Sequence, residues 1–563
     1  MNRSDFSFPQ TLVAPSRAHS VLCAMLDRQA TAIGDKTLMV FDDGESWTYA
    51  RTQAEARATA AGLAGLGVSK GDTVLVWLPN GPLIFKLHLA LGYLGAIFVP
   101  INLALRGGVL QHIVTNSAAK LIVCHQDLLE RLTTIALGAL TTVVHVGGEG
   151  DDRLGLAQLP ETVLTGLAAD LVDAEAKPSD IQGIFYTSGT TGPSKGVICP
   201  SLHTSVMARV ALRFLGPDDR FLINMPYFHL GGALVPFAVI ERGASMAMLT
   251  RFRTPTFWDD VRRTGSTACY ILDSIRTFLM KQPPTPRDAD NPLRFVVQQP
   301  LSHDSAEFSA RFDVTIFTQW DMTEVLPVIL SGPVSRTSNL QKGYCGEAAV
   351  FSPACEIRLV DADDFEVPDG ELGELVVRCD QPWVLSPGYW QMPEATAKVW
   401  RNGWFHTGDI FRRNAEGSYF YIDRIKDAIR RRGENISSSE VEAEALAHDD
   451  IELAAAVAVP SEHSEDEVLL VLQPKQGRSV DPRACFDFLV PRLPHYMLPR
   501  FIRIVREMQM TETIKIRKNV LRDEGVTAET WDREAEGIVV KAARIGEGAP
   551  RIKTHDRTES DRS

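Results

Sequence analysis

The chain has 563 residues and a mass of 62.1 kDa, enough for several domains with sizeable buried cores. Hydrophobic residues make up 45% of it and charged residues 23%, ordinary globular values that exclude a disordered or fibrous protein. The net charge of −13 and the pI near 5.6 argue against a general nucleic-acid-binding protein, whose binding face is usually basic.

The first apolar segments indicate neither an export signal nor a membrane span. Residues 1–20 lack a sustained apolar stretch followed by a small-residue cleavage site, so no signal peptide is expected. Residues 88–105 are apolar, but glycines and Pro100 interrupt them, and they fall short of the roughly 20 residues that a span needs. We expect a buried helix that runs into a strand, in a cytoplasmic protein.

Strand-like and helix-like segments alternate through most of the chain, which is typical of a layered α/β fold. An Ala-rich helix is expected over residues 53–66, before a strand over 73–77. Further short strands are expected at 120–124, 141–146, 221–224, 268–272, 295–297 and 314–317.

The pattern changes near residue 425. The strands expected before it, at 374–377 and 418–422, suggest a small β-rich subdomain. The segments expected after it are a capped helix from Ser438, strands at 454–459 and 468–472, a helix at 484–489 and a strand at 501–505. The predicted fold class is therefore α/β, with a large N-terminal multi-subdomain part (residues 1–425) of layered sheets, helices and the β-rich subdomain. A small mobile α+β C-terminal domain (426–540) and a disordered tail (541–563) follow it.

The eight cysteines form no CxxC pair and no dense framework. We therefore expect reduced thiols of an intracellular protein, with neither disulfides nor a zinc site.

The strongest chemical motif is YTSGTTGPSKGV at residues 186–197, directly after an apolar segment. Its glycines allow backbone N–H groups to approach a ligand closely, its hydroxyls add donors and Lys195 adds a positive charge. The spacing differs from that of the Walker loop. The motif predicts a phosphate-binding loop rather than a flexible Ser/Gly turn, because a linker rarely follows a strand so closely.

Further motifs follow in a fixed order: MPYFHLGG at 225–232, WDMTE at 320–324, GWFHTGD at 403–409, DRIKD at 423–427 and a late Lys515. Together they resemble the adenylate-forming enzymes, the superfamily of acyl-CoA synthetases, luciferases and peptide-synthetase adenylation domains. The resemblance covers roughly residues 20–525. The segment 421–442 is similar to stand-alone acyl-CoA ligases of the carnitine/crotonobetaine kind.

The resemblance implies catalytic roles for four residues. Lys515 would bridge the substrate carboxylate and the α-phosphate of ATP, with Arg517 and Lys518 as its nearest alternatives. Thr323 would donate to the α-phosphate, and Glu324 would hold magnesium, since that ion prefers oxygen ligands. His229 would line the acid pocket, although a packed core histidine is an open alternative.

The resemblance also implies a set of nucleotide- and CoA-binding positions. Asp409 would accept the two ribose hydroxyls, Trp320 would stack on adenine, and Lys426 would be the hinge between the domains. Arg424 would contact the ribose and phosphate side, unless it forms a surface ion pair. The remaining positions expected to bind ATP or CoA are Thr187, Ser188, Gly189, Thr190, Thr191, Lys195, Gln298, Gln299, Pro300, Gln319, Asp321, Met322, Ile422, Gly433 and Glu434.

The chain departs from the family pattern at four places. Asp321 replaces a residue without a side chain, which would favour a hydroxylated or cationic acid. Gln298 and Gln299 replace small residues and put the pocket size in doubt. The segment 343–348 lacks a proline, and Ile514 replaces the glycine before Lys515.

The function expected is ATP-dependent acid–CoA ligation through an acyl-AMP, with ATP, magnesium and coenzyme A, and with domain rotation between the half-reactions. Partners would be the small carboxylic acid, ATP and CoA, with no nucleic acid and no membrane, and a homodimer is one option. The alternatives are an enzyme that loads a separate carrier protein and a degenerate nucleotide-binding protein. Arg430, Arg431 and Arg432 would bind a CoA phosphate or form a solvated charge run.

Overall fold

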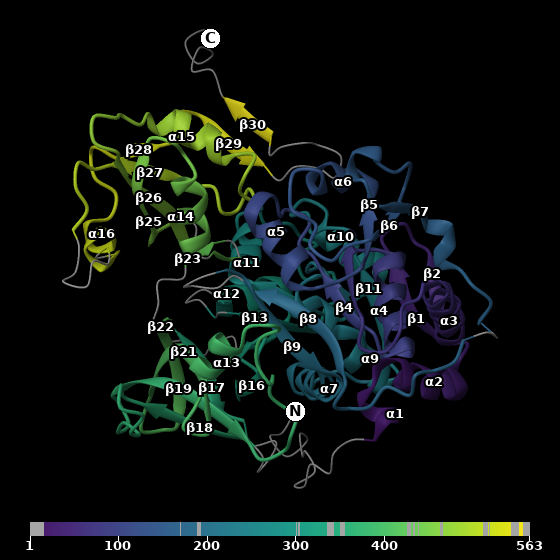
Figure 1. Ribbon diagram of the computed structural model, residues 1–563. Helices are drawn as coiled ribbons and strands as arrows, with labels where there is room; N and C mark the ends of the chain where they lie inside the picture. Colours follow the sequence, from purple (N-terminus) through teal and green to yellow (C-terminus); the bar gives the residue numbers. More distant parts are fainter. Residues whose placement is uncertain are drawn as a thin grey trace, which may run out of the picture.

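The computed structural model describes residues 16–168, 171–187, 193–299, 301, 305–334, 343–349, 355–424, 429–431, 434–436, 438–461, 465–509, 516, 518–541 and 551–554. They form a large part that contains three sheets and a small C-terminal unit (Figure 1).

The first sheet has the strand order β7-β6-β5-β3-β4-β8-β9 and is parallel except for its last strand pair. Its central strands β3, β4 and β5 are nearly continuous apolar runs, as expected of parallel strands that are buried on both faces. Its strands are β3 (Thr73–Trp77), β4 (Ile97–Pro100), β5 (Leu121–His125), β6 (Thr142–Val146), β7 (Ala157–Pro160), β8 (Ile181–Thr187) and β9 (Lys195–Pro200). The helical elements of this region are α1 (Arg17–Ser20), α2 (Leu22–Ile33), α3 (Tyr49–Gly65), α4 (Pro82–Leu94), α5 (Gly107–Asn116), α6 (Gln126–Leu132), η2 (Asp152–Leu154) and η3 (Glu161–Leu164).

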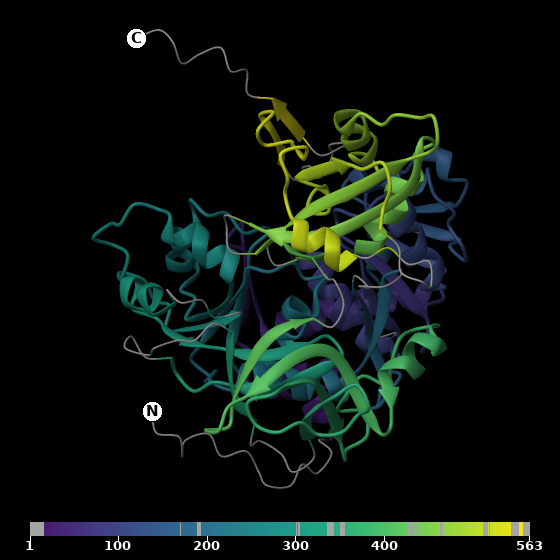
Figure 2. The same ribbon diagram turned by 90° about the vertical axis from the view of Figure 1, so that its left-hand side faces the viewer.

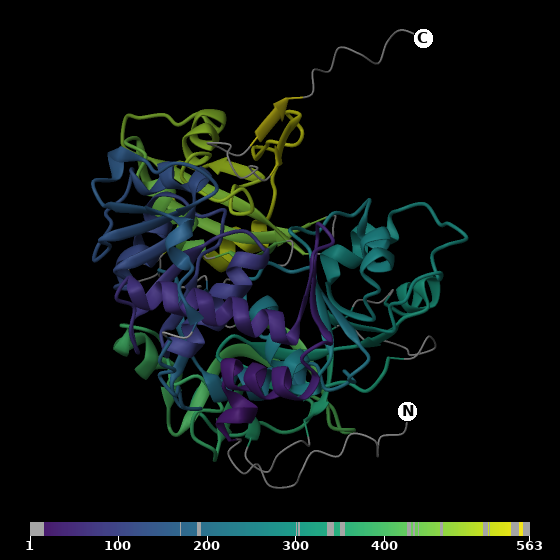
Figure 3. The ribbon, with the colours of Figure 1, turned by 90° about the vertical axis from the view of Figure 1, so that its right-hand side faces the viewer.

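The second sheet has the order β14-β13-β12-β10-β11-β1-β2 and is parallel except for β2. Helices α2, α4, α7 and α9 pack against one another between the two sheets (Figure 3), and one apolar core joins both sheets there. The strands are β1 (Thr37–Phe41), β2 (Ser46–Thr48), β10 (Arg220–Ile223), β11 (Ser245–Met248), β12 (Ala268–Leu272), β13 (Phe295–Gln299) and β14 (Thr315–Phe317). The helices are α7 (Ser201–Ala211), α8 (Leu230–Ala233), α9 (Val235–Arg242), α10 (Phe257–Thr264), α11 (Asp273–Met280) and α12 (Ser305–Phe312).

The third sheet is antiparallel and confirms the expected β-rich region. It contains β15 (Gln319–Met322), β16 (Val325–Leu330), β17 (Tyr344–Ala348), β18 (Cys355–Val360), β19 (Leu372–Cys379), β20 (Trp400–Arg401), β21 (Trp404–Arg413) and β22 (Ser418–Arg424), with α13 (Pro393–Val399) beside it.

One prediction about the cysteines is wrong. Cys355 and Cys379 form a disulfide, because the antiparallel pairing of β18 with β19 places them directly opposite each other although they are 24 residues apart in sequence. The other six cysteines are free and buried.

The small C-terminal unit has its own apolar cores and lies at the opposite end of the large part from the β-rich sheet (Figures 1 and 2). It is built from β23 (Ile429–Arg431), β24 (Glu434–Ile436), α14 (Ser438–Leu446), β25 (Ile451–Pro460), β26 (Asp466–Pro474), α15 (Pro482–Leu489), β27 (Phe501–Ile504), α16 (Lys518–Glu524), β28 (Trp531–Asp532), β29 (Ile538–Lys541) and β30 (Arg551–Thr554).

Residues 551–554, which the sequence analysis places in the tail, form β30 and pair with β29, with Ile552 opposite Val540. The described part of the chain has no helix that is both long enough and apolar enough to cross a membrane.

Candidate nucleotide- and acid-binding site

The two ends of the expected phosphate loop meet as neighbouring antiparallel strands. Thr187 at the end of β8 pairs with Lys195 at the start of β9, and the Thr187 hydroxyl lies 3.5 Å from the Lys195 carbonyl oxygen. Ser188, Gly189, Thr190 and Thr191 lie outside the described residues.

Lys195 and Glu324 are linked through Tyr389, which the sequence analysis missed. The Lys195 ammonium lies 4.9 Å from the centre of the Tyr389 ring, a cation–π contact. The Tyr389 hydroxyl donates a 2.8 Å hydrogen bond to Oε1 of Glu324, whose side chain is buried. The proposed magnesium ligand is therefore oriented next to the base of the phosphate loop.

The Thr323–Glu324 turn joins β15 to β16 and is fixed from behind by a buried histidine. His203 on α7 places Nε2 3.0 Å from the Thr323 carbonyl oxygen and Nδ1 2.8 Å from that of Val384. Thr323 itself is half-buried. The pair thus forms a turn that connects two strands and does not begin a helix.

Trp320 and Asp409 come together although 89 residues separate them. The Trp320 indole N–H donates a 3.0 Å hydrogen bond to Oδ2 of Asp409, and both side chains are buried. Phe411 packs edge-on against Trp320, with the ring centres 5.6 Å apart. The backbone of Arg424 lies directly opposite Asp409 in the sheet, while the side chains of Ile422 and Arg424 are outside the described residues.

The two consecutive glutamines at the end of β13 take different roles, because successive side chains of a strand point to opposite faces. Gln298 is fully buried and donates to the Ser305 hydroxyl at 2.8 Å, a contact that does not support a role in nucleotide binding. Gln299 donates to the Gln319 carbonyl at 2.9 Å and to Oδ2 of Asp321 at 3.2 Å. Pro300 lies outside the described residues, and Met322 packs on the main core.

The 225–232 motif forms the loop after β10 and the first turn of α8, and polar side chains hold it. Asn80 donates to the Met225 carbonyl and accepts from the Tyr227 N–H. The Tyr227 hydroxyl is hydrogen-bonded to His88 at 2.8 Å, and the second ring nitrogen of His88 contacts Gln182. These contacts place His229 at the N-terminal end of α8.

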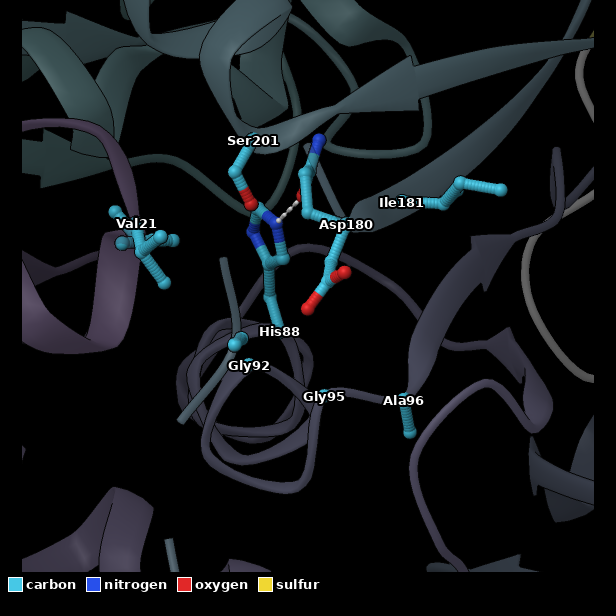
Figure 4. A pocket seen from close by; sticks show the side chains of 11 residues that line it. Val21, His88, Gly92, Gly95, Ala96, Asp180, Ile181 and Ser201 are labelled. Atoms are coloured by element: carbon cyan, nitrogen blue, oxygen red, sulfur yellow. Dashed lines mark hydrogen bonds between the residues drawn. The ribbon is translucent and has the colours of Figure 1, made fainter. Parts of the chain in front are cut away.

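Figure 4 shows the small cavity beside His88, between α4 and β8. Burial lowers the pKa of His88 to about 4, so its ring is neutral at pH 7. The residues that line this cavity include none of the candidate site residues.

The small unit contacts this region through two carboxylates. Glu434 on β24 lies 3.3 Å from Nε2 of His229, and the Ser194 hydroxyl donates to Glu440 on α14 at 2.5 Å. Burial favours the neutral form of Glu434, but the charges of His229 and His495 outweigh it and lower its pKa. His229 is therefore not a packed core residue: it faces the other domain, with 36% of its side chain exposed.

The three consecutive arginines separate into different roles. Arg431 is 2% exposed, pairs with Glu467 at 2.8 Å and donates to the Tyr496 and Leu498 carbonyl oxygens, so the idea that it binds a CoA phosphate is wrong. Arg430 remains partly exposed, and its charge acts on Asp321 across the domain interface.

The expected catalytic lysine and hinge fall on undescribed positions. Lys515, Lys426, Gly433, Arg432 and Arg517 lie outside the described residues. Lys518, an alternative to Lys515, pairs with Glu442 at 2.6 Å and donates to Ser438 within the small unit. That engagement leaves Lys515 as the better candidate.

The described residues contain no cluster of three or more His, Cys, Asp or Glu side chains that could hold a metal ion by themselves. Magnesium is commonly held by one or two carboxylates together with substrate phosphates. Glu324, beside Lys195 and Tyr389, fits that pattern.

Comparison with known proteins identifies the family. The AMP-binding enzyme family matches residues 26–390, and the AMP-binding enzyme C-terminal domain matches residues 440–515, so the chain belongs to the AMP-binding enzymes. A crotonobetaine/carnitine–CoA ligase of Citrobacter koseri is 28% identical over 527 residues, which cover 88% of this chain and 98% of that protein. A sulfoacetate–CoA ligase of Cupriavidus necator is 29% identical over 510 residues, covering 88% and 96%.

Solved structures agree with the fold. The o-succinylbenzoate CoA synthetase of Bacillus subtilis superimposes with a TM-score of 0.75 at 21% identity, covering 89% of this chain and 98% of that one. The ATP-bound MatB of Rhodopseudomonas palustris gives a TM-score of 0.61 at 24% identity, covering 89% and 98%.

Proposed function

We propose that the protein is an ATP-dependent acid–CoA ligase. The observation that carries the proposal is the convergence of Trp320, Asp409 and Glu324 from distant motifs onto one region beside the phosphate loop. The named relatives, which are CoA ligases, support the same activity.

The proposed reaction has two steps. A carboxylate oxygen attacks the α-phosphorus of ATP, the bond from that phosphorus to the bridging oxygen breaks, and pyrophosphate leaves with an acyl-AMP formed. The sulfur of the CoA thiol then attacks the acyl carbon, AMP leaves as the acyl–oxygen bond breaks, and the thiol proton is released.

The first step brings two anions together, so positioned donors and cations must lower its barrier. Lys195 and the loop before it would hold the β- and γ-phosphates, and Trp320 and Asp409 would hold the adenosine. Thr323 would donate to the α-phosphate and Lys515 would approach from the small unit. Magnesium, held by Glu324 and the phosphates, would supply charge neutralisation.

The second step would use the arrangement of the small unit on the large part that the structure shows. The hairpin of β23 and β24 reaches the large part through the Glu434–His229 pair, and Glu434 directly follows in sequence Gly433, one of the positions expected to bind ATP or CoA. Rotation at Lys426 would exchange this hairpin for Lys515 between the two steps. The domain limits at 425/426 and 540/541, the homodimer and the cytoplasmic location stay predictions.

The test is a mass-spectrometric assay with ATP, Mg²⁺, CoA and a broad panel of acids. Acyl-CoA, AMP and pyrophosphate in equal amounts are the expected products. Acyl-AMP that persists in the presence of CoA would favour a separate carrier protein as acceptor. Nucleotide binding without any turnover would overturn the proposed enzyme activity.

A matched pair of variants tests the assignment of Lys515. Lys515→Ala should abolish acyl-AMP formation but keep thioester formation from supplied acyl-AMP. Lys518→Ala should retain acyl-AMP formation, because Lys518 is paired within the small unit. Equal loss of both steps in Lys515→Ala contradicts its role.

A further inference from the structure

Two residues at which the chain departs from the family pattern, Asp321 and Gln299, form one hydrogen-bonded group together with Gln319. Asp321 accepts two hydrogen bonds at the same oxygen, Oδ2, from the amides of Gln299 at 3.2 Å and Gln319 at 2.8 Å. Among the described residues, no group donates to its other oxygen, Oδ1. The two amides therefore orient the carboxyl group and leave one acceptor oxygen available.

This group lies where ligands bind in open α/β sheets, at the carboxyl ends of parallel strands. Gln299 is the last residue of β13, and Asp321 lies in β15, which follows β14 along the chain and packs beside β13. The 225–232 loop with His229 leaves the same edge of the sheet, after β10. Asp321 thus shares this edge with His229, and it directly follows Trp320, the residue expected to stack on adenine.

Among the residues that the structure describes, the neighbours of Asp321 are polar, and none is a cation in direct contact with it. Burial raises the pKa of its carboxyl, whereas Gln299, Gln319 and the more distant charge of Arg430 act in the opposite direction. On the far side of Gln319, the Arg213 guanidinium donates to the Gln319 side-chain oxygen at 3.4 Å and to the Ser331 carbonyl oxygen. The nearby Tyr270 is buried, and its pKa is raised well above the ordinary value by burial and by the Asp321 charge.

A half-buried carboxyl group without a direct cationic partner gains most from a ligand that donates a hydrogen bond to it. We propose that Asp321, positioned by Gln299 and Gln319, is a specificity-determining residue that accepts a hydrogen bond from the acid substrate. The chain then prefers acids that carry a hydroxyl or protonated amine away from the carboxylate over hydrocarbon acids of the same shape. This inference rests on the proposed function and names the substrate class of that site.

Isosteric acids test the inference directly. The aliphatic series compares pentanoate with 4-hydroxybutyrate and 4-aminobutyrate. The aromatic series compares 4-methylbenzoate with 4-hydroxybenzoate, and 4-ethylbenzoate with 4-(aminomethyl)benzoate. Pyrophosphate release gives kcat/KM for each acid. We call an acid with the hydroxyl or amine a donor acid, and its hydrocarbon counterpart the methyl analogue. In at least one series, kcat/KM of the wild-type enzyme should be about 10- to 100-fold higher for a donor acid than for its methyl analogue, as expected for a hydrogen bond to a charged group. The hydroxyl and amine arms show which donor is used.

The variant Asp321→Asn keeps the shape of the side chain and removes its charge. It should lose most of this preference, through a lower kcat/KM for the donor acid and an unchanged or higher value for the methyl analogue. Asp290→Asn, at an exposed site whose side chain is 75% accessible, is the control and should keep the preference. Binding of AMP by calorimetry shows that each variant is folded.

The possible failures are distinguishable. A wild-type enzyme that activates no donor acid or prefers the methyl analogues, or an Asp321→Asn enzyme with an unchanged preference, overturns the role of Asp321. Such results leave the ligase activity intact as long as other acids yield acyl-CoA. Absence of turnover with every acid overturns the proposed function as well.

Discussion

The hydroxyl of Ser194 donates a 2.5 Å hydrogen bond to Oε1 of Glu440 and so joins the phosphate-loop segment of the large part to helix α14 of the small unit. Glu444, one turn further along α14, lies against the N-terminus of α5, where a Cβ atom on Gly108 would be 2.9 Å from its Oε1. An acidic side chain is favoured there because the end of the helix carries partial positive charge. The acidic side chains of α14 thus contribute to holding the small unit against the large part, together with the Glu434–His229 pair.

Domain docking should therefore depend on pH through Glu440. Burial, with an added contribution from the Glu444 charge, raises the pKa of Glu440 to about 7 from its ordinary 4.5. The other groups around it are Ser194, Tyr496 and His112, which contacts the Ser194 carbonyl. The docked form binds a proton that the separated form releases, so docking is favoured below pH 4.5 and weakens by up to about 3 kcal/mol as pH rises to 7 and above.

Small-angle scattering and limited proteolysis at pH 5.5, 7 and 8.5 measure this effect. Glu440→Gln should make the domain arrangement independent of pH over this range, whereas Glu529→Gln, at an exposed position in the same unit, should behave like the wild type. A pH dependence that persists in Glu440→Gln would assign the effect to another group.

Tyr389→Phe should slow adenylation selectively. The change removes the hydroxyl that orients Glu324, and a hydrogen bond to a charged group contributes about 1.5–3 kcal/mol. ATP–pyrophosphate exchange should fall about 10- to 100-fold and require more Mg²⁺, while thioester formation from supplied acyl-AMP stays within about twofold. Tyr49→Phe is the control, because it removes a buried hydrogen bond to the Ala244 carbonyl oxygen that involves no candidate site residue. Equal effects on both half-reactions would mean that Tyr389 acts only on stability.

His88 should make the large part less stable in acid. Its pKa is lowered by burial to about 4 from the 6.5 of an unfolded chain, so the unfolded state binds more protons between these values. The stability contribution is full above pH 6.5 and decreases as pH falls to 4, by about 3 kcal/mol in total. His88→Gln should reduce this pH slope in urea unfolding, whereas His125→Gln, at a partly exposed histidine, should not.

Arg430 and Arg431 allow a comparison between a partly exposed and a buried charge. Arg431→Ala leaves Glu467 buried without its partner and should destabilise the small unit by about 3–5 kcal/mol. Arg430→Ala should change stability by less than about 1 kcal/mol, because its ion pair with Glu465 is long and partly exposed. Thermal unfolding of both variants measures the difference, and similar losses would show that the burial of Arg431 is unimportant.

The sequence by itself determined the class of fold, most strands and the motifs, because apolar periodicity and local glycine, hydroxyl and charge patterns are properties of short segments. It predicted Trp320, Asp409 and Glu324 as site residues, and the structure brings Trp320 into contact with Asp409. Only the tertiary structure decided which side chains meet. Tyr389 reaches Glu324 across 65 residues, Glu440 reaches Ser194 across 246, and Cys355 reaches Cys379 through strand pairing. These contacts depend on how sheets and domains pack, and no local pattern encodes them. For the same reason, the sequence could not separate the buried Arg431 from the partly exposed Arg430, or the core-facing Gln298 from Gln299, which orients Asp321.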